Sequence, residues 1–178
     1  MSRRICINYL ALKILIKSLE SGDWEAIKSV YLEGLATGQA TFETEAPSPE
    51  DWDSGHLPFG RIGAYPDSDG RLVGWAALSS VSKRKAYAGV AEVSVYVAAA
   101  ARGQGVGRAL LQALILESER NGIWTLQASI FPENQASLKL HESLGFRTVG
   151  HRERVSTLNG VWRNTVLLER RSKLVGRD

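Results

Sequence analysis

Residues 92–107 read EVSVYVAAAARGQGVG, and they are the most informative part of the sequence about the fold. Its first six residues are rich in β-branched and aromatic types and alternate along the chain, which predicts a β-strand. The glycines at positions 103, 105 and 107 predict a tight loop, followed by a helix over residues 108–120 that ends at Asn121-Gly122. A strand over residues 124–130 completes a β-α-β unit, so the two strands are expected to be parallel, with a right-handed crossover.

The rest of the chain is predicted to add hairpins and helices around this unit. Ile27, Val30, Tyr31 and Leu35 share one face of a helix that ends near Gly38. The pair Asn159-Gly160 is the favoured two-residue turn of a β-hairpin. The other predicted elements are a strand over residues 12–17, a short helix at 50–52, a hairpin of strands 61–65 and 72–80, a helix from Asn134, and hairpin strands over about 147–156 and 162–169.

Length and composition predict one folded domain. The 178 residues are 44% hydrophobic and 23% charged, which is typical of globular proteins and excludes disordered, collagen-like and disulfide-framework classes. We expect an N-terminal extension over residues 1–11, one domain over 12–170 and a basic C-terminal tail over 171–178. Cys6 is the only cysteine and the three histidines are far apart, so neither an internal disulfide nor a metal site is expected.

The distribution of charge argues against a nucleic-acid partner. The net charge is +3, but the excess of Lys and Arg lies in the two tails, at Arg3 and Arg4 and over residues 170–177. The body of the chain is therefore slightly negative and gives no support to a basic groove. No stretch approaches the roughly 20 apolar residues of a membrane span, and no small-residue cleavage site follows the N-terminal apolar run. We expect a cytoplasmic protein with no membrane partner.

The glycine loop has two interpretations. Closely spaced glycines let backbone N–H groups point into one concavity, and the N-terminus of the following helix adds the positive end of its dipole, an arrangement that binds phosphate. The loop lacks the Lys-Ser/Thr ending of a P-loop and the spacing of the dinucleotide motif, so a plain strand-to-helix turn is the alternative. Arg102 and Arg108 flank the loop and favour a pyrophosphate ligand.

Two segments resemble the GNAT superfamily of acyl-CoA-dependent N-acetyltransferases. Residues 102–107 resemble the family loop Arg/Gln-x-x-Gly-x-Gly/Ala, and residues 134–137 with 140–146 resemble its Asn-x-x-Ala…Leu-Gly-Phe segment. The resemblance covers residues 14–169. It implies an α/β (α+β) fold with a mixed, mostly antiparallel twisted sheet, a central splayed pair of parallel strands, and flanking helices.

Within the superfamily, three features resemble the phosphinothricin and methionine-sulfone acetyltransferase branch. They are ATFETE at residues 40–45, EVSVYV at residues 92–97, and His141 where most relatives have tyrosine. Val81 and Ser82 depart from the pattern of that branch, which leaves the exact acceptor open. The branch also implies a homodimer.

The resemblance implies acetyl-CoA as co-substrate. Backbone groups of Val95, Tyr96 and Val97 would hydrogen-bond its pantetheine arm, and Asn134 would reach the coenzyme near the sulfur. The loop that would hold the pyrophosphate consists of Arg102, Gly103, Gln104, Gly105, Val106, Gly107 and Arg108.

Glu92 and His141 are the candidate catalytic residues. A carboxylate at the edge of an apolar strand is costly to desolvate, which favours its acting as a base toward a substrate ammonium. The alternative for Glu92 is a rim carboxylate paired with a cation of residues 83–85. The resemblance implies that His141 faces the thioester, where it would protonate the leaving thiolate or relay the amine proton. A lone histidine is otherwise more often structural.

The expected acceptor is a small-molecule amine. The resemblance implies acetylation of the α-amine of phosphinothricin, methionine sulfone or methionine sulfoximine. The attack is expected to be direct, in a ternary complex, because the only cysteine lies in the N-terminal extension and offers no nucleophile for an acyl-enzyme. Arg84 would pair with an acidic group of the acceptor, while Phe42 and Tyr87 would wall the pocket. A solvated basic loop is the alternative for Arg84.

Two other functions stay open at this point. One is acetylation of protein, peptide or polyamine amines, which needs a broad and open acceptor groove. The other is a non-catalytic module that binds acyl-CoA without turnover.

Overall fold

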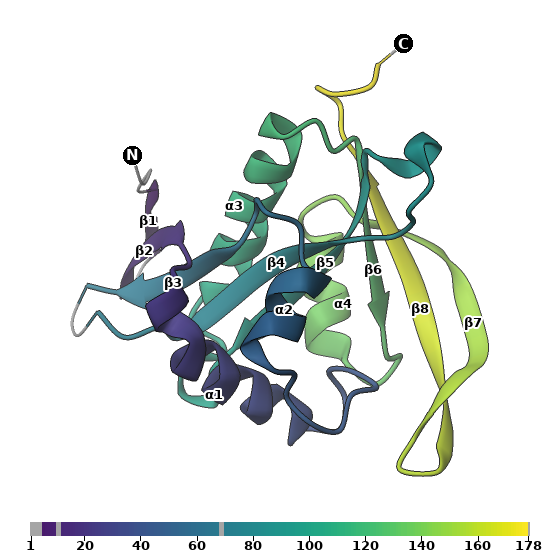
Figure 1. Cartoon of the computed structure of the whole chain (residues 1–178), viewed down its shortest axis with the longest axis horizontal. Helices are drawn as coiled ribbons and strands as arrows, with labels where there is room; N and C mark the ends of the chain where they lie inside the picture. Colours follow the sequence, from purple (N-terminus) through teal and green to yellow (C-terminus); the bar gives the residue numbers. More distant parts are fainter. Residues whose placement is uncertain (1–4, 10–11, 68–69, 178) are drawn as a thin grey trace.

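A parallel pair of strands lies inside a larger sheet, as residues 92–107 predict. The computed structural model describes residues 5–9, 12–67 and 70–177, and over these it forms an eight-stranded sheet of order β1-β2-β3-β4-β5-β6-β8-β7 (Figure 1). The strands are β1 Ile5–Tyr9, β2 Leu12–Ser18, β3 Ile62–Pro66, β4 Gly74–Ser80, β5 Val90–Val97, β6 Thr125–Ile130, β7 Arg147–Leu158 and β8 Val161–Arg171. The α-helices are α1 Trp24–Leu35, α2 Pro49–Gly55, α3 Val106–Arg120 and α4 Gln135–Glu142.

The parallel pair is short and diverges. β5 pairs with β6 only from Val90 to Glu92, opposite Thr125 to Gln127, whereas its antiparallel pairing with β4 continues to Val97. All other neighbouring strands are antiparallel. Beyond Glu92, the edge of β5 that faces β6 therefore has no strand partner within the described chain, which confirms the splayed pair.

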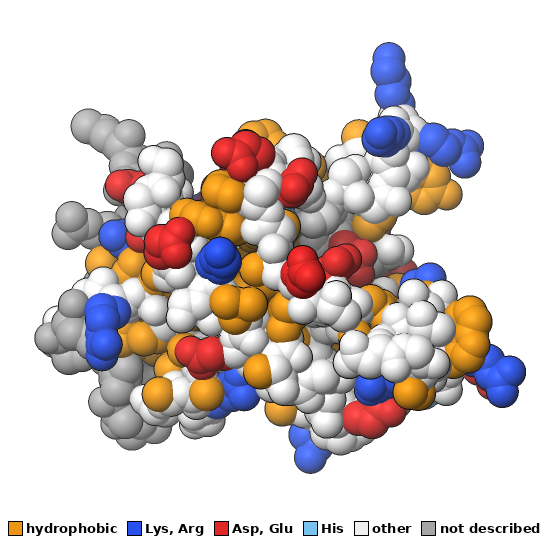
Figure 2. Space-filling model, turned by 60° about the horizontal axis from the view of Figure 1, so that its bottom comes forward, with side chains coloured by type: hydrophobic (Ala, Val, Ile, Leu, Met, Phe, Trp, Pro, Cys, Tyr) orange, Lys and Arg blue, Asp and Glu red, His pale blue; other side chains and the backbone are white. Residues whose placement is uncertain are grey.

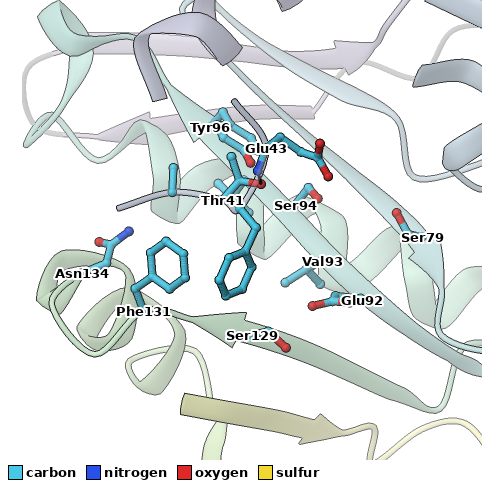
Figure 3. Close-up of a pocket in the computed structure, with 13 residues that line it drawn as sticks. Thr41, Glu43, Ser79, Glu92, Val93, Ser94, Tyr96, Ser129, Phe131 and Asn134 are labelled. Atoms are coloured by element: carbon cyan, nitrogen blue, oxygen red, sulfur yellow. Dashed lines mark hydrogen bonds between the residues drawn. The ribbon is translucent and has the colours of Figure 1, made fainter. Parts of the chain in front are cut away.

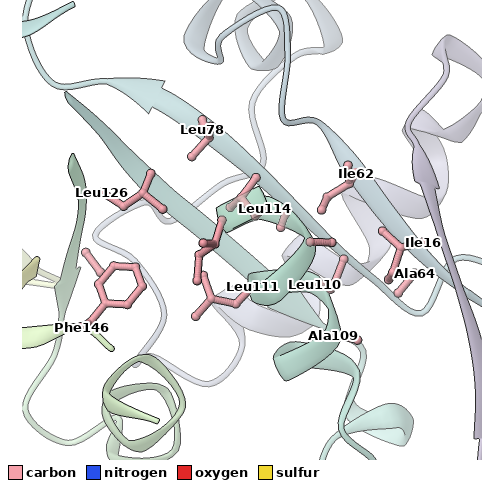
Figure 4. Close-up of a cluster of buried hydrophobic side chains, with 14 of the residues drawn as sticks. Ile16, Ile62, Ala64, Leu78, Ala109, Leu110, Leu111, Leu114, Leu126 and Phe146 are labelled. Atoms are coloured by element: carbon pink, nitrogen blue, oxygen red, sulfur yellow. The ribbon is translucent and has the colours of Figure 1, made fainter. Parts of the chain in front are cut away.

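Helix α3 packs on one face of the sheet and builds the larger core. Leu110, Leu111 and Leu114 of α3 are fully buried, and they share a cluster with Leu78 of β4 and Leu126 of β6 (Figure 4). Burying one such leucine side chain contributes about 1.5–3 kcal/mol. This cluster fixes α3, and with it the glycine loop at the N-terminus of the helix, against the end of β5.

Helices α1 and α2 cover the opposite face through a cluster of aromatic side chains. Trp75 of β4 is 1% exposed, and its indole N–H donates to the carbonyl oxygen of Ile27 in α1 at 3.2 Å. Tyr96 of β5 stacks on Trp75 with 4.7 Å between the ring centroids. Trp52 of α2 packs edge-on against the same indole. The two clusters therefore meet across β4 and β5.

The predicted C-terminal hairpin is confirmed. Asn159 and Gly160 have φ angles of 50° and 78°, the left-handed values that a tight hairpin turn needs. β8 also pairs with β6 and continues to Arg171, two residues beyond the predicted strand end. The Arg171 guanidinium donates to the carbonyl oxygens of Trp124 and Val175, so the first residue of the expected basic tail is part of the sheet.

The N-terminal stretch predicted as an extension contains a strand. Ile5–Tyr9 forms β1 and pairs with β2, with Ile7 opposite Ile14 in the register. Residues 1–4, 10–11, 68–69 and 178 lie outside the described residues, including the Arg3 and Arg4 of the charge argument. The domain boundaries at residues 12 and 170 stay a prediction.

One face of the surface carries mixed charge. Figure 2 shows acidic side chains in the middle of this face and most Lys and Arg side chains toward its edges. The absence of a nucleic-acid partner stays a prediction.

Within the described ranges, every helix is too short or too polar to cross a bilayer.

Candidate active site

Two adjoining cavities open where β5 and β6 diverge. The first, here called the loop cleft, has a volume of about 470 Å³ and lies between the end of β5, the glycine loop and α4. The second, here called the carboxylate cavity, has a volume of about 300 Å³ and contains Glu92 and Glu43. The two share the lining residues Ala40, Val95, Tyr96 and Asn134. The two cavities therefore adjoin beside the free edge of β5.

The glycine loop has the backbone shape of an anion cradle. Gly103 and Gly105 have φ angles of 74° and 83°, which side-chain-bearing residues rarely adopt, and α3 begins directly after them at Val106. A Cβ atom on Gly107 would lie 3.2 Å from the Leu140 side chain, so this glycine permits close approach of α3 and α4. The glycine loop and the N-terminus of α3, with the positive end of the helix dipole, therefore lie in the wall of the cleft.

Each of the two arginines that flank the loop donates a hydrogen bond to a neighbouring group of the protein. The Nε of Arg102 donates to the carbonyl oxygen of Val97 at 3.1 Å, and Arg108 donates to the Ser143 hydroxyl at 2.8 Å. Both line the loop cleft, as do all the other residues predicted to contact acetyl-CoA except Gln104. The Gln104 side chain turns back and donates to the carbonyl oxygen of Ala100 at 2.7 Å.

Asn134 joins the two cavities. Its Oδ1 accepts from the backbone N–H of Ser137 at 3.1 Å and so caps α4, while its Nδ2 donates to the carbonyl oxygen of Gln39 at 3.2 Å. The side chain thus ties the N-terminus of α4 to the segment between α1 and α2. The contact of Asn134 with a coenzyme stays a prediction.

Glu92 stands at the fork of the two parallel strands. It is half-buried, lies opposite Ser79 of β4, and shares the carboxylate cavity with Ser79 and Ser129 (Figure 3). Within the described part of the chain, its carboxylate forms no hydrogen bond or ion pair. The alternative interpretation, a rim carboxylate paired with residues 83–85, therefore finds no support in the geometry. A free carboxylate in a polar cavity can accept a proton from a bound amine.

His141 is buried behind the wall of the loop cleft, next to Ser137, and lines neither cavity. Its side chain is 4% exposed, and its ring packs edge-on against Phe146 at 5.0 Å between centroids. Nδ1 lies 2.8 Å from the carbonyl oxygen of Ser137, so Nδ1 carries the proton, and Nε2 is buried without a partner. Burial lowers the pKa of His141, and the hydrogen bond to Ser137 partly offsets this effect. The role of His141 toward a thioester stays a prediction.

The predicted acceptor residues separate into two places. Phe42 lines the carboxylate cavity and packs edge-on against Phe131 at 4.8 Å between centroids. Arg84 and Tyr87 are exposed, contact one another with the guanidinium 5.7 Å from the ring centroid, and line neither cavity. The charged side chains among the described lining of the carboxylate cavity are Glu43 and Glu92, with no Lys or Arg beside them.

Several residues of the carboxylate cavity were not predicted from the sequence. Thr41 and Glu43 flank Phe42, Ser79 lies on β4, Ser129 lies on β6, and Phe131 directly follows β6. The signal for Thr41 and Glu43 was their position next to Phe42.

Tyr96 adds a hydroxyl group near Thr41. Burial, together with the nearby Tyr31 hydroxyl, raises the pKa of Tyr96. The Tyr96 hydroxyl is thus a neutral hydrogen-bonding group near Thr41.

Over the described ranges, no three His, Cys, Asp or Glu side chains are grouped in a way that could hold an ion.

The chain is similar to known proteins in sequence and in structure. The profile of the acetyltransferase (GNAT) family matches residues 24–146. A phosphinothricin N-acetyltransferase of Alcaligenes faecalis is 34% identical, over 94% of this chain and 87% of that protein. An L-methionine sulfoximine/L-methionine sulfone acetyltransferase of Pseudomonas aeruginosa is 34% identical, over 76% of this chain and 73% of its own length. The crystal structure of a GNAT superfamily phosphinothricin acetyltransferase from Sinorhizobium meliloti, in complex with AcCoA, superposes with a TM-score of 0.79 at 27% identity, covering 92% of this chain and 95% of that one.

Proposed function

This chain belongs to the acetyltransferase (GNAT) family, and we propose that it transfers an acetyl group from acetyl-CoA to the α-amine of a small amino-acid-like acceptor. The acceptor class is that of phosphinothricin, methionine sulfone and methionine sulfoximine, on which the relatives named above act. The proposal rests on one observation: two cavities adjoin at the free edge of β5. One lies beside the glycine loop, and the other contains Glu92, whose carboxylate is unpaired within the described chain.

The loop cleft fits acetyl-CoA. The left-handed glycines and the N-terminus of α3 would take the pyrophosphate, with Arg102 and Arg108 at the sides of the cradle. Val95, Tyr96 and Val97 lie on the strand edge that β6 leaves free, where backbone groups can pair with the amides of a pantetheine arm. The bound thioester supplies an activated acyl carbonyl. A strand amide such as that of Val95 would donate to its oxygen as negative charge develops there.

Glu92 would act as the general base. An acceptor amine is protonated near neutral pH, and its nitrogen becomes a nucleophile only after the proton leaves. Glu92 would take this proton directly or through one water, a role that typically contributes 10²- to 10⁴-fold in rate. Both substrates must be present together, because the transfer we propose is direct. His141 lines neither cavity, so we assign it no contact with the acceptor.

A panel of amines tests the proposal through the release of free CoA. Purified protein and acetyl-CoA are mixed with phosphinothricin, methionine sulfone, methionine sulfoximine and the common amino acids, and thiol is measured over time. We expect release with at least one small amino acid and none without acceptor. A protein that acetyl-CoA protects against heat but that releases no thiol with any amine would be a binding module instead.

A second acceptor class is favoured by the charge of the carboxylate cavity. Its charged lining consists of Glu43 and Glu92, and the cations of residues 83–85 lie outside it. Two carboxylates suit an acceptor with a second positive charge, such as a polyamine or a lysine-bearing peptide. The panel therefore includes a polyamine and a lysine peptide. Release of CoA with these two amines alone would mean that the acceptor is cationic and not a small amino acid, and the acetyltransferase chemistry would still hold.

The cytoplasmic location and the homodimer stay predictions.

A further inference from the structure

The segment over residues 37–43 forms part of both cavities. Thr37, Gln39 and Ala40 line the loop cleft, and residues 40–43 line the carboxylate cavity. Most of the segment has no regular secondary structure, and a Cβ on Gly38, whose φ is 63°, would meet nothing within 4 Å. Backbone hydrogen bonds from Thr37 and Gly38 hold its start to the end of α1, and Asn134 and Arg163 contact it from other parts of the chain.

Arg163 of β8 makes three contacts that bear on this segment. Its Nη1 donates to the carbonyl oxygen of Gly38 at 3.4 Å, and its Nη2 lies 3.2 Å from a carboxylate oxygen of Glu133. Its guanidinium carbon lies 4.6 Å from the centroid of the Phe131 ring. The side chain is 20% exposed, so these contacts are partly shielded from water.

The ring that Arg163 covers is the one that supports Phe42. Phe131 is buried, and its ring meets the Phe42 ring edge-to-face in the wall of the carboxylate cavity. Arg163 thus holds one end of the segment by a hydrogen bond and, through Phe131, fixes the surface on which the other end packs. Asn134 provides a separate anchor at Gln39.

We propose that Arg163 is a positioning residue for the acceptor: it holds residues 37–43 and Phe131 in the arrangement that shapes the carboxylate cavity. This inference rests on the proposed function, because it assigns the acceptor to that cavity. Arg163 touches none of the reacting groups. Its loss should therefore weaken acceptor binding much more than the chemical step or the binding of acetyl-CoA.

The planar guanidinium is what makes three contacts possible at once. One Nη reaches Gly38, the other reaches Glu133, and the flat face covers Phe131. A lysine could keep the ion pair with Glu133 but has a single nitrogen and no flat face. Arg163→Lys should therefore restore only part of what Arg163→Gln removes.

Steady-state kinetics of Arg163→Gln and Arg163→Lys test the inference, with the best acceptor of the amine panel. We expect the acceptor KM of Arg163→Gln to rise about tenfold, the loss typical of one charge-assisted contact, with kcat and the Kd of acetyl-CoA changed less than about threefold. Arg163→Lys should lie between this variant and the wild type. Arg147→Gln is the matched control, because it removes an arginine–carboxylate pair, with Glu169, from the same hairpin and leaves the segment untouched.

Hydrogen exchange gives a readout that needs no acceptor. The amides of residues 37–43 should exchange faster in Arg163→Gln than in the wild type, and those of β4 and α3 should not change. Unchanged exchange in this segment, or faster exchange with a wild-type acceptor KM, overturns the inference. A wild-type protein that acetylates no amine of the panel contradicts the proposed function instead, and in that case the exchange comparison alone decides whether Arg163 anchors the segment.

Discussion

Glu92 of β5 pairs in register with Gln127 of β6, and this is the last pair before the two parallel strands separate. The divergence that frees the edge of Val95 therefore begins at the residue that carries the carboxylate. Under the proposed function, the acyl group would lie along that edge and the amine beside Glu92, so the fork of the strands would bring the two substrates together. Such preorganisation is the main means by which a protein brings two substrates into reacting geometry.

Replacement of Glu92 by glutamine should slow turnover and leave coenzyme binding intact. The amide keeps the shape of the side chain but cannot take a proton, so we expect kcat to fall by about 10²- to 10⁴-fold. The Kd of acetyl-CoA, measured by calorimetry, should stay within about threefold because Glu92 is absent from the lining of the loop cleft. Glu142→Gln, an exposed carboxylate of α4, is the control. A Glu92→Gln enzyme of wild-type rate across pH would remove Glu92 from the mechanism.

The glycine cradle is tested by a matched pair of substitutions at the two ends of α3. Gly105 and Gly122 both have left-handed φ angles, 83° and 79°, so alanine at either costs about 1–2 kcal/mol of stability. Only Gly105→Ala alters the loop cleft. Acetyl-CoA at 100 times its Kd should stabilise the wild type and Gly122→Ala by about 2.7 kcal/mol, and Gly105→Ala by much less. Equal thermal shifts in all three proteins would contradict the cradle.

Much of the fold could be predicted because its signals are local. The alternation of residues 92–97, the glycines before α3 and the Asn159-Gly160 turn each act over a few residues, and the structure confirms all three. The strand β1 was missed because it depends on a partner: residues 5–9 are ordered by pairing with β2 and not by a distinctive pattern of their own. Pairing with β6 likewise extends β8 to Arg171.

The site was predictable where a motif lies on one element. Glu92 and nearly all of the glycine loop line the two cavities, and their roles there stay predictions. Ser79 and Ser129 reach Glu92 only through the register of β4 and the course of β6, which no local pattern specifies. The burial of His141 and the position of Arg84 outside the lining of both cavities are set by tertiary packing in the same way, so local spacing could not show either.

His141 should influence stability more than catalysis, and the effect should depend on pH. Burial lowers its pKa in the folded state, so below the unfolded value of about 6.5 the unfolded chain binds a proton that the folded chain does not. The free energy of unfolding should therefore fall as pH decreases from 7 to 5, by at most about 1.4 kcal/mol per pH unit for one group. Burial also lowers the pKa of His56, which adds to the same slope.

Urea denaturation of His141→Asn at pH 5 and pH 7 measures this contribution. The variant should show a smaller difference between the two pH values than the wild type, and a double variant with His56→Gln should show a smaller difference still. The kcat/KM of folded His141→Asn should stay within about tenfold of the wild type, the scale of a small indirect effect. A hundredfold loss of kcat in a folded protein would restore the role in proton transfer that the family resemblance implies.

Glu43 should discriminate between acidic and cationic acceptors. It is exposed at the rim of the carboxylate cavity, so its charge acts through water and its effect should be modest, about two- to fivefold in KM. Removing this negative charge in Glu43→Gln should lower the KM of phosphinothricin, whose acidic group it repels, and raise the KM of a polyamine, which it attracts. Glu45→Gln is the matched control, because Glu45 is an exposed carboxylate two residues away that lines neither cavity.

The opposite signs of the change in KM for the two acceptors are the decisive feature, since a distorted cavity would raise both KM values. High salt should reduce both changes because exposed charges are screened. If KM moves in the same direction for the two acceptors, the charge of this cavity does not select the acceptor.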